Sequence, residues 1–196
     1  MKVVLLHAFP LDERMWDEQR KVLAGHEVVA PNLYDLGGNS IHTWAGRILA
    51  ETLGDLAVVG ASLGGYVGLA MARQTPDRVR ALLLAGSRAS ADPPEYPPGP
   101  SDRTTDELVR GIEALRDRSD ATDVVAAFQG PLAVVVGDQD ELLPVEEARR
   151  IAESAPNGWL AAVEGAGHLV NLDAPERFNE LLGELLERAP EEMKQL

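Results

Sequence analysis

The chain has 196 residues, of which 45% are hydrophobic and 26% charged, a composition typical of a globular domain. Its formal net charge of −14 argues against nucleic acid or an anionic membrane as a partner, because both need a basic face. There is no cysteine, which excludes disulfides, thiolate metal sites and a cysteine nucleophile and suits a cytoplasmic protein. Its apolar runs are too short for a signal peptide or a membrane span, and we expect neither.

Apolar, β-branched runs alternate with amphipathic segments along the chain. Strands are predicted at residues 2–6, 26–30, 57–59, 79–85, 132–136 and 159–163. Helices are predicted at residues 12–24, 41–53, 63–74, 145–154 and 175–188, and the tail from Pro190 is expected to fray. This alternation predicts an α/β fold, with one mostly parallel sheet of about six strands and helices on both faces. Ligands bind such sheets at the carboxyl ends of the strands.

Residues 88–130 interrupt the alternation. The nine residues from Asp92 to Pro100 include five prolines, so this stretch is neither helix nor central strand. Helices are predicted after it, at 105–117 and 121–128. We interpret the chain as a single domain, residues 1–196, in which this segment is an insertion that forms a short lid. Phe128 is most simply a core residue, with the alternative that Phe128 and Tyr96 line a site from the lid.

A serine lies between two glycines where the third predicted strand meets its helix, in Gly60-Ala-Ser-Leu-Gly64. A serine on such a sharp turn points its hydroxyl out above the sheet, and the crowded backbone requires small residues two before and two after it. The following helix favours negative charge that develops near its first turn. The pattern alone is only suggestive, so the rest of the chain must supply a base and an acid.

Two further candidates follow in order, each in a loop after a predicted strand. Asp140 follows the fifth strand and His168 the sixth. Ser62 is then the nucleophile, His168 the base that removes its proton, and Asp140 the acid that fixes the tautomer of His168 and stabilises its cation.

Three other carboxylates compete with Asp140 for the role of acid. Asp138 and Glu141 lie in the same loop and also suit a turn or a cap, and Asp92 follows the fourth strand. Among the other histidines, His7 either contacts substrate or, as we favour, holds backbone groups of its loop. His26 and His42 are expected at the surface. No set of residues has metal-ligand spacing, so we predict no metal.

Five blocks carry a resemblance to the α/β-hydrolase superfamily that covers nearly the whole chain. They are His7-Ala-Phe-Pro10, Gly60-Ala-Ser-Leu-Gly-Gly65, the Gly137-x-x-Asp-x-x-x-Pro144 block, Gly165-Ala-Gly-His168 and Leu172-Asp-Ala-Pro-Glu-Arg-Phe178. The chain order of serine, acid and histidine is also that of the superfamily. The resemblance implies that Asp140 is the acid and that the backbone N–H groups of Leu63 and Phe9 form the oxyanion hole. It also implies that no cofactor is required.

The chain departs from the superfamily pattern in three places. Ala8 replaces the usual glycine, the N-terminal hairpin is absent, and the lid is short. We therefore expect six strands in the order 2-1-3-4-5-6. The resemblance implies a serine hydrolase that cleaves a carboxylic ester or lactone through an acyl-enzyme, since the segment from Ser62 to Asp92, which ends in Gly86-Ser-Arg-Ala-Ser-Ala-Asp92, looks most like the enol-lactonase and small-esterase branch. The alternatives are a C–C bond hydrolase, thioesterase or perhydrolase on the same triad, or a non-catalytic binding member. The partner is a small molecule, and the protein is a monomer or small homo-oligomer.

Overall fold

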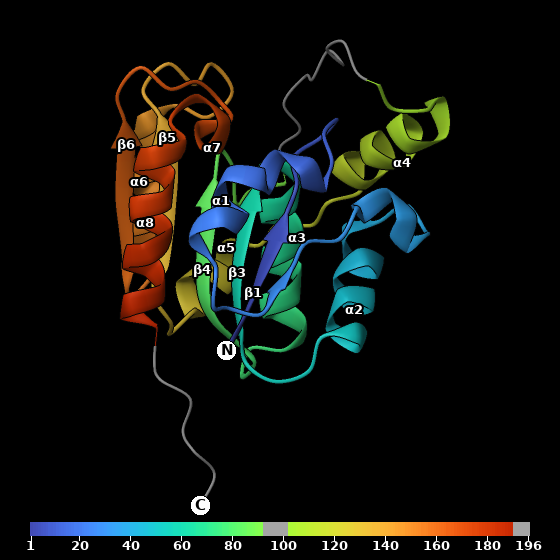
Figure 1. Ribbon diagram of the computed structural model, residues 1–196, viewed down its shortest axis with the longest axis horizontal. Coiled ribbons are helices and arrows are strands. Elements are labelled where there is room, and N and C mark those ends of the chain that lie inside the picture. Colours follow the sequence, from blue (N-terminus) through green and yellow to red (C-terminus); the bar gives the residue numbers. More distant parts are fainter. Residues whose placement is uncertain (92–101, 190–196) are drawn as a thin grey trace, which may run out of the picture.

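Six parallel strands form one sheet at the centre of the molecule, in the order β2-β1-β3-β4-β5-β6 (Figure 1). The computed structural model describes residues 1–91 and 102–189, so Asp92 and Tyr96 lie outside the described residues. The strands are β1 (Lys2–Leu6), β2 (Val28–Val29), β3 (Leu56–Ala61), β4 (Val79–Ala85), β5 (Leu132–Gly137) and β6 (Gly158–Val163). The predicted α/β class, the parallel pairing and the strand order are confirmed.

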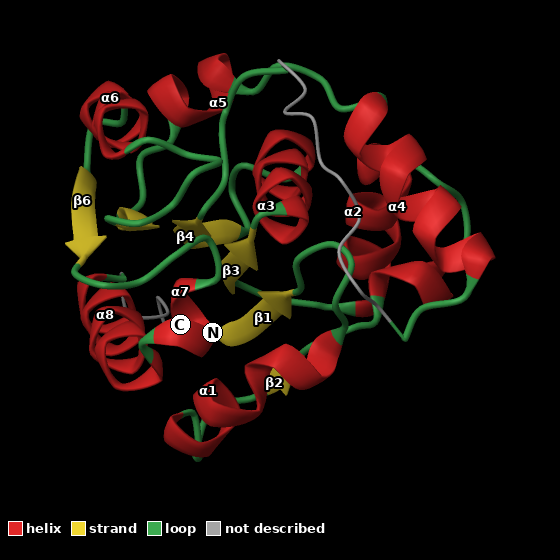
Figure 2. Cartoon of the chain, turned by 90° about the horizontal axis from the view of Figure 1, so that it is seen from above, coloured by secondary structure: helices red, strands yellow, loops and turns green. Residues whose placement is uncertain are grey.

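Helices cover both faces of this sheet (Figure 2). On one face lie η2 (Leu33–Leu36), α2 (Ile41–Glu51), α3 (Leu63–Gln74), α4 (Thr105–Arg116), α5 (Thr122–Ala127) and α6 (Val145–Ser154). On the other face lie η1 (Glu13–Trp16), α1 (Asp17–Val22), α7 (Val170–Asp173) and α8 (Pro175–Arg188).

Alternate residues of each strand enter the two halves of the core. In β1, Val4 and Leu6 pack under α2 and α3, whereas Val3 and Leu5 pack under η1 and α8, and all four are fully buried. Burying each such side chain is worth about 1.5–3 kcal/mol, so a strand that is apolar on both faces is stable only between two helical layers.

The observed elements differ from the predicted ones mainly between β1 and α2. The predicted helix at 12–24 is split into η1 and α1, because the side chain of Asp12 caps a 3₁₀ turn by accepting the N–H of Arg14. The predicted strand at 26–30 pairs with β1 through only two residues, and Pro31 offers no N–H to extend it. The short helices η2 and α7 were not predicted. Both are single turns, too short for a hydrophobic period.

The connection between β4 and β5 carries α4, which begins with a capping box between Thr104 and Glu107. Helix α4 lies against the segment after β2, where Arg110 Nη1 donates to the carbonyl of Tyr34 at 2.8 Å.

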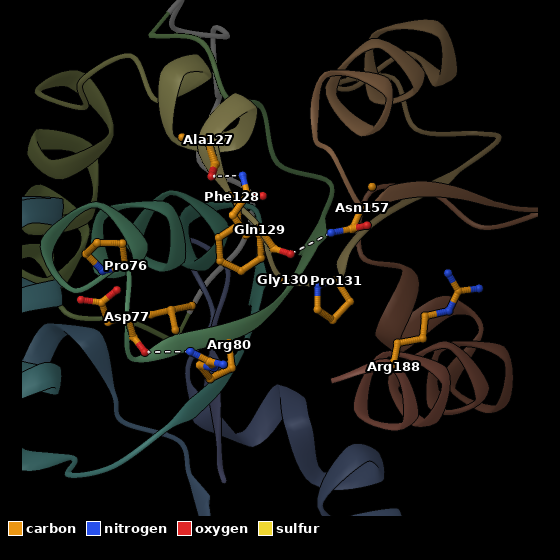
Figure 3. A pocket seen from close by; sticks show the side chains of 12 residues that line it. Pro76, Asp77, Arg80, Ala127, Phe128, Gln129, Gly130, Pro131, Asn157 and Arg188 are labelled. Carbon is orange, nitrogen blue, oxygen red and sulfur yellow. Dashed lines mark hydrogen bonds between the residues drawn. The ribbon is translucent and has the colours of Figure 1, made fainter. Parts of the chain in front are cut away.

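The connection between β4 and β5 ends at the amino ends of the strands. Phe128 is buried there beside a cavity of about 730 Å³ that lies where β4, β5 and β6 begin (Figure 3). Because Ser62 follows the carboxyl end of β3, Phe128 lies away from the site; the prediction that its ring belongs to the core is confirmed, and the alternative that it lines the site is wrong.

Candidate active site

Ser62 occupies the sharp turn between β3 and α3. Its backbone has φ 48° and ψ −110°, and it is the sole non-glycine residue with a positive φ in the described part of the chain. The Ser62 N–H donates to the carbonyl of Ala85 at 2.8 Å, and the N–H of Gly65 donates to the carbonyl of Ser62 at 3.0 Å. Such a conformation costs on the order of 1–3 kcal/mol, which these bonds to β4 and α3 offset.

The glycines around Ser62 are required by close backbone contacts. A Cβ at Gly60 would lie 2.4 Å from the carbonyl carbon of Gly64, and a Cβ at Gly64 would lie 2.0 Å from the carbonyl oxygen of Leu6 in β1. A Cβ at Gly65 would lie 2.0 Å from Ser87 Oγ. Since backbone atoms cannot yield like a side chain, a larger residue at Gly60 or Gly64 would move the turn itself.

Ser62, His168 and Asp140 form a continuous chain of hydrogen bonds. Ser62 Oγ lies 3.0 Å from His168 Nε2, and His168 Nδ1 lies 2.9 Å from Asp140 Oδ2. The side chain of His168 is 19% exposed, whereas that of Asp140 is fully buried. The three residues come from the loops after β3, β6 and β5, and the parallel sheet brings these loops to one edge. In this arrangement the histidine can take a proton from the serine.

Asp140 is held as a carboxylate by the groups around it. Burial by itself would raise its pKa. The hydrogen bond and the charge of His168, together with the N–H groups of Leu142 and Leu143 at 2.8 and 3.0 Å, outweigh burial and lower the pKa below its usual value. Asp140 is therefore ionised at neutral pH and oriented towards His168.

The two rival acids of the same loop face elsewhere. Asp138 is exposed and accepts the N–H of Gly165 at 2.8 Å, so it shapes the turn beside the histidine loop. Glu141 is exposed as well, and neither rival bonds to His168 within residues 1–91 and 102–189. The third rival, Asp92, falls outside that part of the chain.

Leu63 and Phe9 lie on neighbouring loops at the same edge of the sheet. Leu63 is the first residue of α3, and Phe9 follows β1, whose last residue Leu6 pairs with Gly60 of β3. Neither N–H donates to an acceptor among the described residues. The N–H of Ala8, in contrast, donates to Met15 Sδ at 3.2 Å, and its side chain is fully buried.

His7 holds the backbone of its surroundings, as predicted. Its Nε2 accepts the N–H of Leu33 at 2.9 Å, and its Nδ1 donates to the carbonyl of Ala8 at 3.1 Å. The ring is completely buried, and burial lowers the pKa of His7 to about 4. It is therefore neutral at physiological pH. His26 and His42 are exposed, as expected.

Sequence reasoning missed two residues that support the site. Ser87, which directly follows β4 and Gly86, is fully buried, and its hydroxyl donates to the carbonyl of Ser62 at 3.0 Å. Asp173 accepts the N–H of Gly167 at 2.8 Å and so anchors the loop before His168. Both lie in segments that the sequence marked by resemblance, but nothing in the sequence indicated their bonds.

Within the described residues, no cluster of three or more histidine, aspartate and glutamate side chains could hold a metal ion. In the same part of the chain, no helix has both the length and the apolar character needed to cross a bilayer.

The comparisons with known proteins agree with this geometry. The model of the alpha/beta hydrolase family matches residues 3–181, so the chain belongs to that family. The chain is 27% identical to pimeloyl-[acyl-carrier protein] methyl ester esterase of Aromatoleum aromaticum, covering 89% of this chain and 93% of that protein. That alignment runs over 233 positions, more than the 196 residues of this chain, so the relative carries inserted residues.

Two further relatives are named as hydrolases. The solved structure of a thermophilic esterase from Thermogutta terrifontis superposes with a TM-score of 0.80 and 28% identity, over 95% of this chain and 89% of that one. A protein of Pseudomonas savastanoi named putative carbamate hydrolase RutD is 33% identical over 82 residues, which cover 42% of this chain and 31% of that protein.

Proposed function

We propose that this protein is a serine hydrolase that cleaves a carboxylic ester through a Ser62–His168–Asp140 triad. The observation that carries the proposal is the unbroken hydrogen-bond chain, 3.0 Å from Ser62 Oγ to His168 Nε2 and 2.9 Å from His168 Nδ1 to Asp140 Oδ2. Ser62 lies on a strained turn that holds its hydroxyl beside a histidine, and this position supports its role as the nucleophile. The ester class is supported by the two esterases among the relatives.

The reaction runs in two halves. Ser62 Oγ attacks the carbonyl carbon of the ester while its proton passes to His168 Nε2, and the carboxylate of Asp140 stabilises the imidazolium. The carbonyl oxygen becomes an oxyanion that accepts hydrogen bonds from the N–H groups of Leu63 and Phe9. The loss of one such donor typically costs about 3–4 kcal/mol of transition-state stabilisation. His168 then protonates the departing alcohol, which leaves Ser62 acylated.

Water completes the cycle. His168 accepts a proton from a water molecule, the resulting hydroxide attacks the acyl carbon, and the tetrahedral intermediate expels Ser62 as its oxygen regains the proton. The residues of this chain supply each proton transfer, and no step requires a cofactor. We propose that the segment from about residue 88 to 130 acts as a short lid above this site and that the substrate is a small ester or lactone.

A fluorophosphonate probe tests the nucleophile, because it phosphonylates only an activated serine. We expect wild type to be labelled at Ser62 and Ser62→Ala to remain unlabelled. Ser154→Ala is the matched control, since that serine only caps the end of α6 and bonds to the carbonyl of Ile151. Labelling of Ser62→Ala at the wild-type rate, or no labelling of wild type, would contradict the proposal.

A substrate panel tests the reaction class. Esters, lactones, acyl thioesters and diketones presented at equal concentration separate an esterase from a thioesterase or a C–C bond hydrolase on the same triad. We expect kcat/KM to be highest for a short ester or lactone. A labelled protein that turns over none of the four would point to a binding role instead.

A further inference from the structure

The loop of residues 7–12, here called the Phe9 loop, is held from the outside by α4. A Cβ at Gly111 in α4 would lie 2.4 Å from Cδ2 of the Phe9 ring and 2.7 Å from its Cε2. The ring therefore packs directly on the backbone of the helix. Gly111 is buried and stands in the middle of α4, where glycine is a poor helix former, so this close approach accounts for its presence there.

A second contact joins the two elements at the end of the loop. Arg103 Nη2, just before α4, lies 2.8 Å from Asp12 Oδ2, and the two side chains are only 11% and 7% exposed. The same guanidinium lies 3.0 Å from Asp102 and 3.3 Å from Glu107. Asp12 Oδ2 also lies 2.6 Å from Arg14 Nη2, so Arg103 is the member of this charge network that ties Asp12 to the segment of α4. A pair this far removed from water is screened less by solvent and salt than an exposed pair and therefore holds its geometry more firmly.

Both contacts hold the chain at and just after the Phe9 N–H, which donates to no acceptor among the described residues. Phe9 is fixed through its ring, and Asp12, three residues later, is fixed through its carboxylate. On the inner side, the N–H of Ala8 is bonded to Met15 Sδ. An oxyanion donor must be held close to its productive position to stabilise the transition state, because a small displacement lengthens its hydrogen bond.

We infer that α4 positions the Phe9 N–H for catalysis and that Gly111 and Arg103 are positioning residues for the oxyanion hole. This inference rests on the proposed function, since it assigns the lid helix a task in that reaction. It extends the function of the lid beyond covering the substrate, because the helix holds one of the two oxyanion donors in place.

Arg103→Met removes the charge that pairs with Asp12 while it keeps an unbranched apolar side chain of similar bulk to the stem of arginine, and Asp12 retains its pair with Arg14. We expect kcat for p-nitrophenyl butyrate to fall about 10- to 100-fold, which is no more than the effect of removing one oxyanion donor completely. KM should stay within about twofold of the wild-type value. A trifluoromethyl ketone, whose carbonyl oxygen becomes an oxyanion when Ser62 adds to its carbon, should bind more weakly by the same factor. Arg177→Met, which removes an equal charge from an exposed pair with Glu180 on α8, should leave kcat unchanged.

Gly111→Ala tests the other contact without weakening the helix. The new methyl group would displace the Phe9 ring, while alanine is a better helix former than glycine. We expect kcat and the affinity for the ketone to fall together, about 3- to 30-fold. Gly183→Ala is the matched control, because that helical glycine in α8 has no atom within 4 Å of its added Cβ. It should leave kcat unchanged.

The outcomes separate this inference from the proposed function. If wild type reacts with the fluorophosphonate probe but Gly111→Ala and a folded Arg103→Met keep the wild-type kcat, the inference fails and the serine hydrolase stands. A fall in kcat with unchanged affinity for the ketone would also overturn it, because the contacts would then be merely structural. If wild type itself is not labelled, the proposed function fails first.

Discussion

The loops after β1 and after β6 each place a histidine at the same edge of the sheet, but only one of these histidines can exchange a proton. His168 is partly exposed and lies between the hydroxyl of Ser62 and the carboxylate of Asp140. His7 is fully buried and lies between the N–H of Leu33 and the carbonyl of Ala8. Both of its nitrogens bond to backbone groups that neither donate nor accept a proton in a reaction.

The difference lies in the partners rather than in the position of the two rings. His168 Nδ1 lies against a buried carboxylate, whereas no acid bonds to His7 among the described residues, and burial lowers its pKa. In this protein, the candidate for a catalytic base is therefore the histidine whose second ring nitrogen bonds to an ionised carboxylate. Three predictions break or sharpen this contrast.

The largest effect is expected from Asp140→Asn, which removes the group that distinguishes His168 from His7. An asparagine cannot stabilise the imidazolium and can hold the wrong tautomer, so we expect kcat for p-nitrophenyl butyrate to fall by about 10³–10⁴-fold. Asp138→Asn, two residues away, keeps an oxygen for the N–H of Gly165 and should change kcat less than about threefold. A small effect of Asp140→Asn would move the acid to another carboxylate, and Asp92→Asn would be the next variant.

His7→Gln should flatten the dependence of stability on pH, since a glutamine oxygen can accept the N–H of Leu33. The pKa of His7 is about 4 in the folded state, below its value of about 6.5 in the unfolded chain. As the pH falls from 6.5 towards 4, the unfolded state gains a proton that the folded state does not bind. The free energy of unfolding of wild type should therefore fall by up to about 3 kcal/mol more than that of His7→Gln over this window.

Urea unfolding followed by tryptophan fluorescence at pH 7.0 and 4.5 measures this difference. His26→Gln is the control, because His26 is exposed, and it should lose as much stability as wild type on acidification. An equally steep loss in His7→Gln would show that other groups cause the acid destabilisation.

The smallest effect is expected from the backbone of Ser62, the residue that bonds to His168 but not to His7. Ser62→Ala and Ser62→Gly both remove the hydroxyl, but only glycine adopts a positive φ without strain. We expect Ser62→Gly to unfold at a free energy about 1 kcal/mol higher than Ser62→Ala, measured by urea denaturation. Equal stabilities, or a less stable glycine variant, would show that the turn stores no strain.

Much of the fold and of the candidate site was predictable from the sequence, and the prediction failed where side-chain contacts outweigh a local pattern. The strand order and the Ser62 turn follow from features that are local or strongly periodic, such as buried β-branched runs and paired glycines. The two interpretations of Phe128, core or site lining, could not be separated by pattern, because hydrophobic side chains suit both equally well; its burial decided for the core. The predicted helix at 12–24 split because the side chain of Asp12, which also pairs with Arg103 from the lid segment, begins a 3₁₀ turn there.

The sequence by itself determined the parallel sheet and the sharp turn at Ser62, because local patterns of neighbouring residues specify both. It also determined the chain order of serine, acid and histidine, because each of the three lies in a recognisable short motif. Only the tertiary structure decided which of two aspartates in one loop bonds to His168, and that His7 is neutral and structural. It also brought Gly111 and Arg103 onto the Phe9 loop, across about a hundred residues of chain. Burial and partners far apart in the sequence set these roles, and no local pattern specifies them.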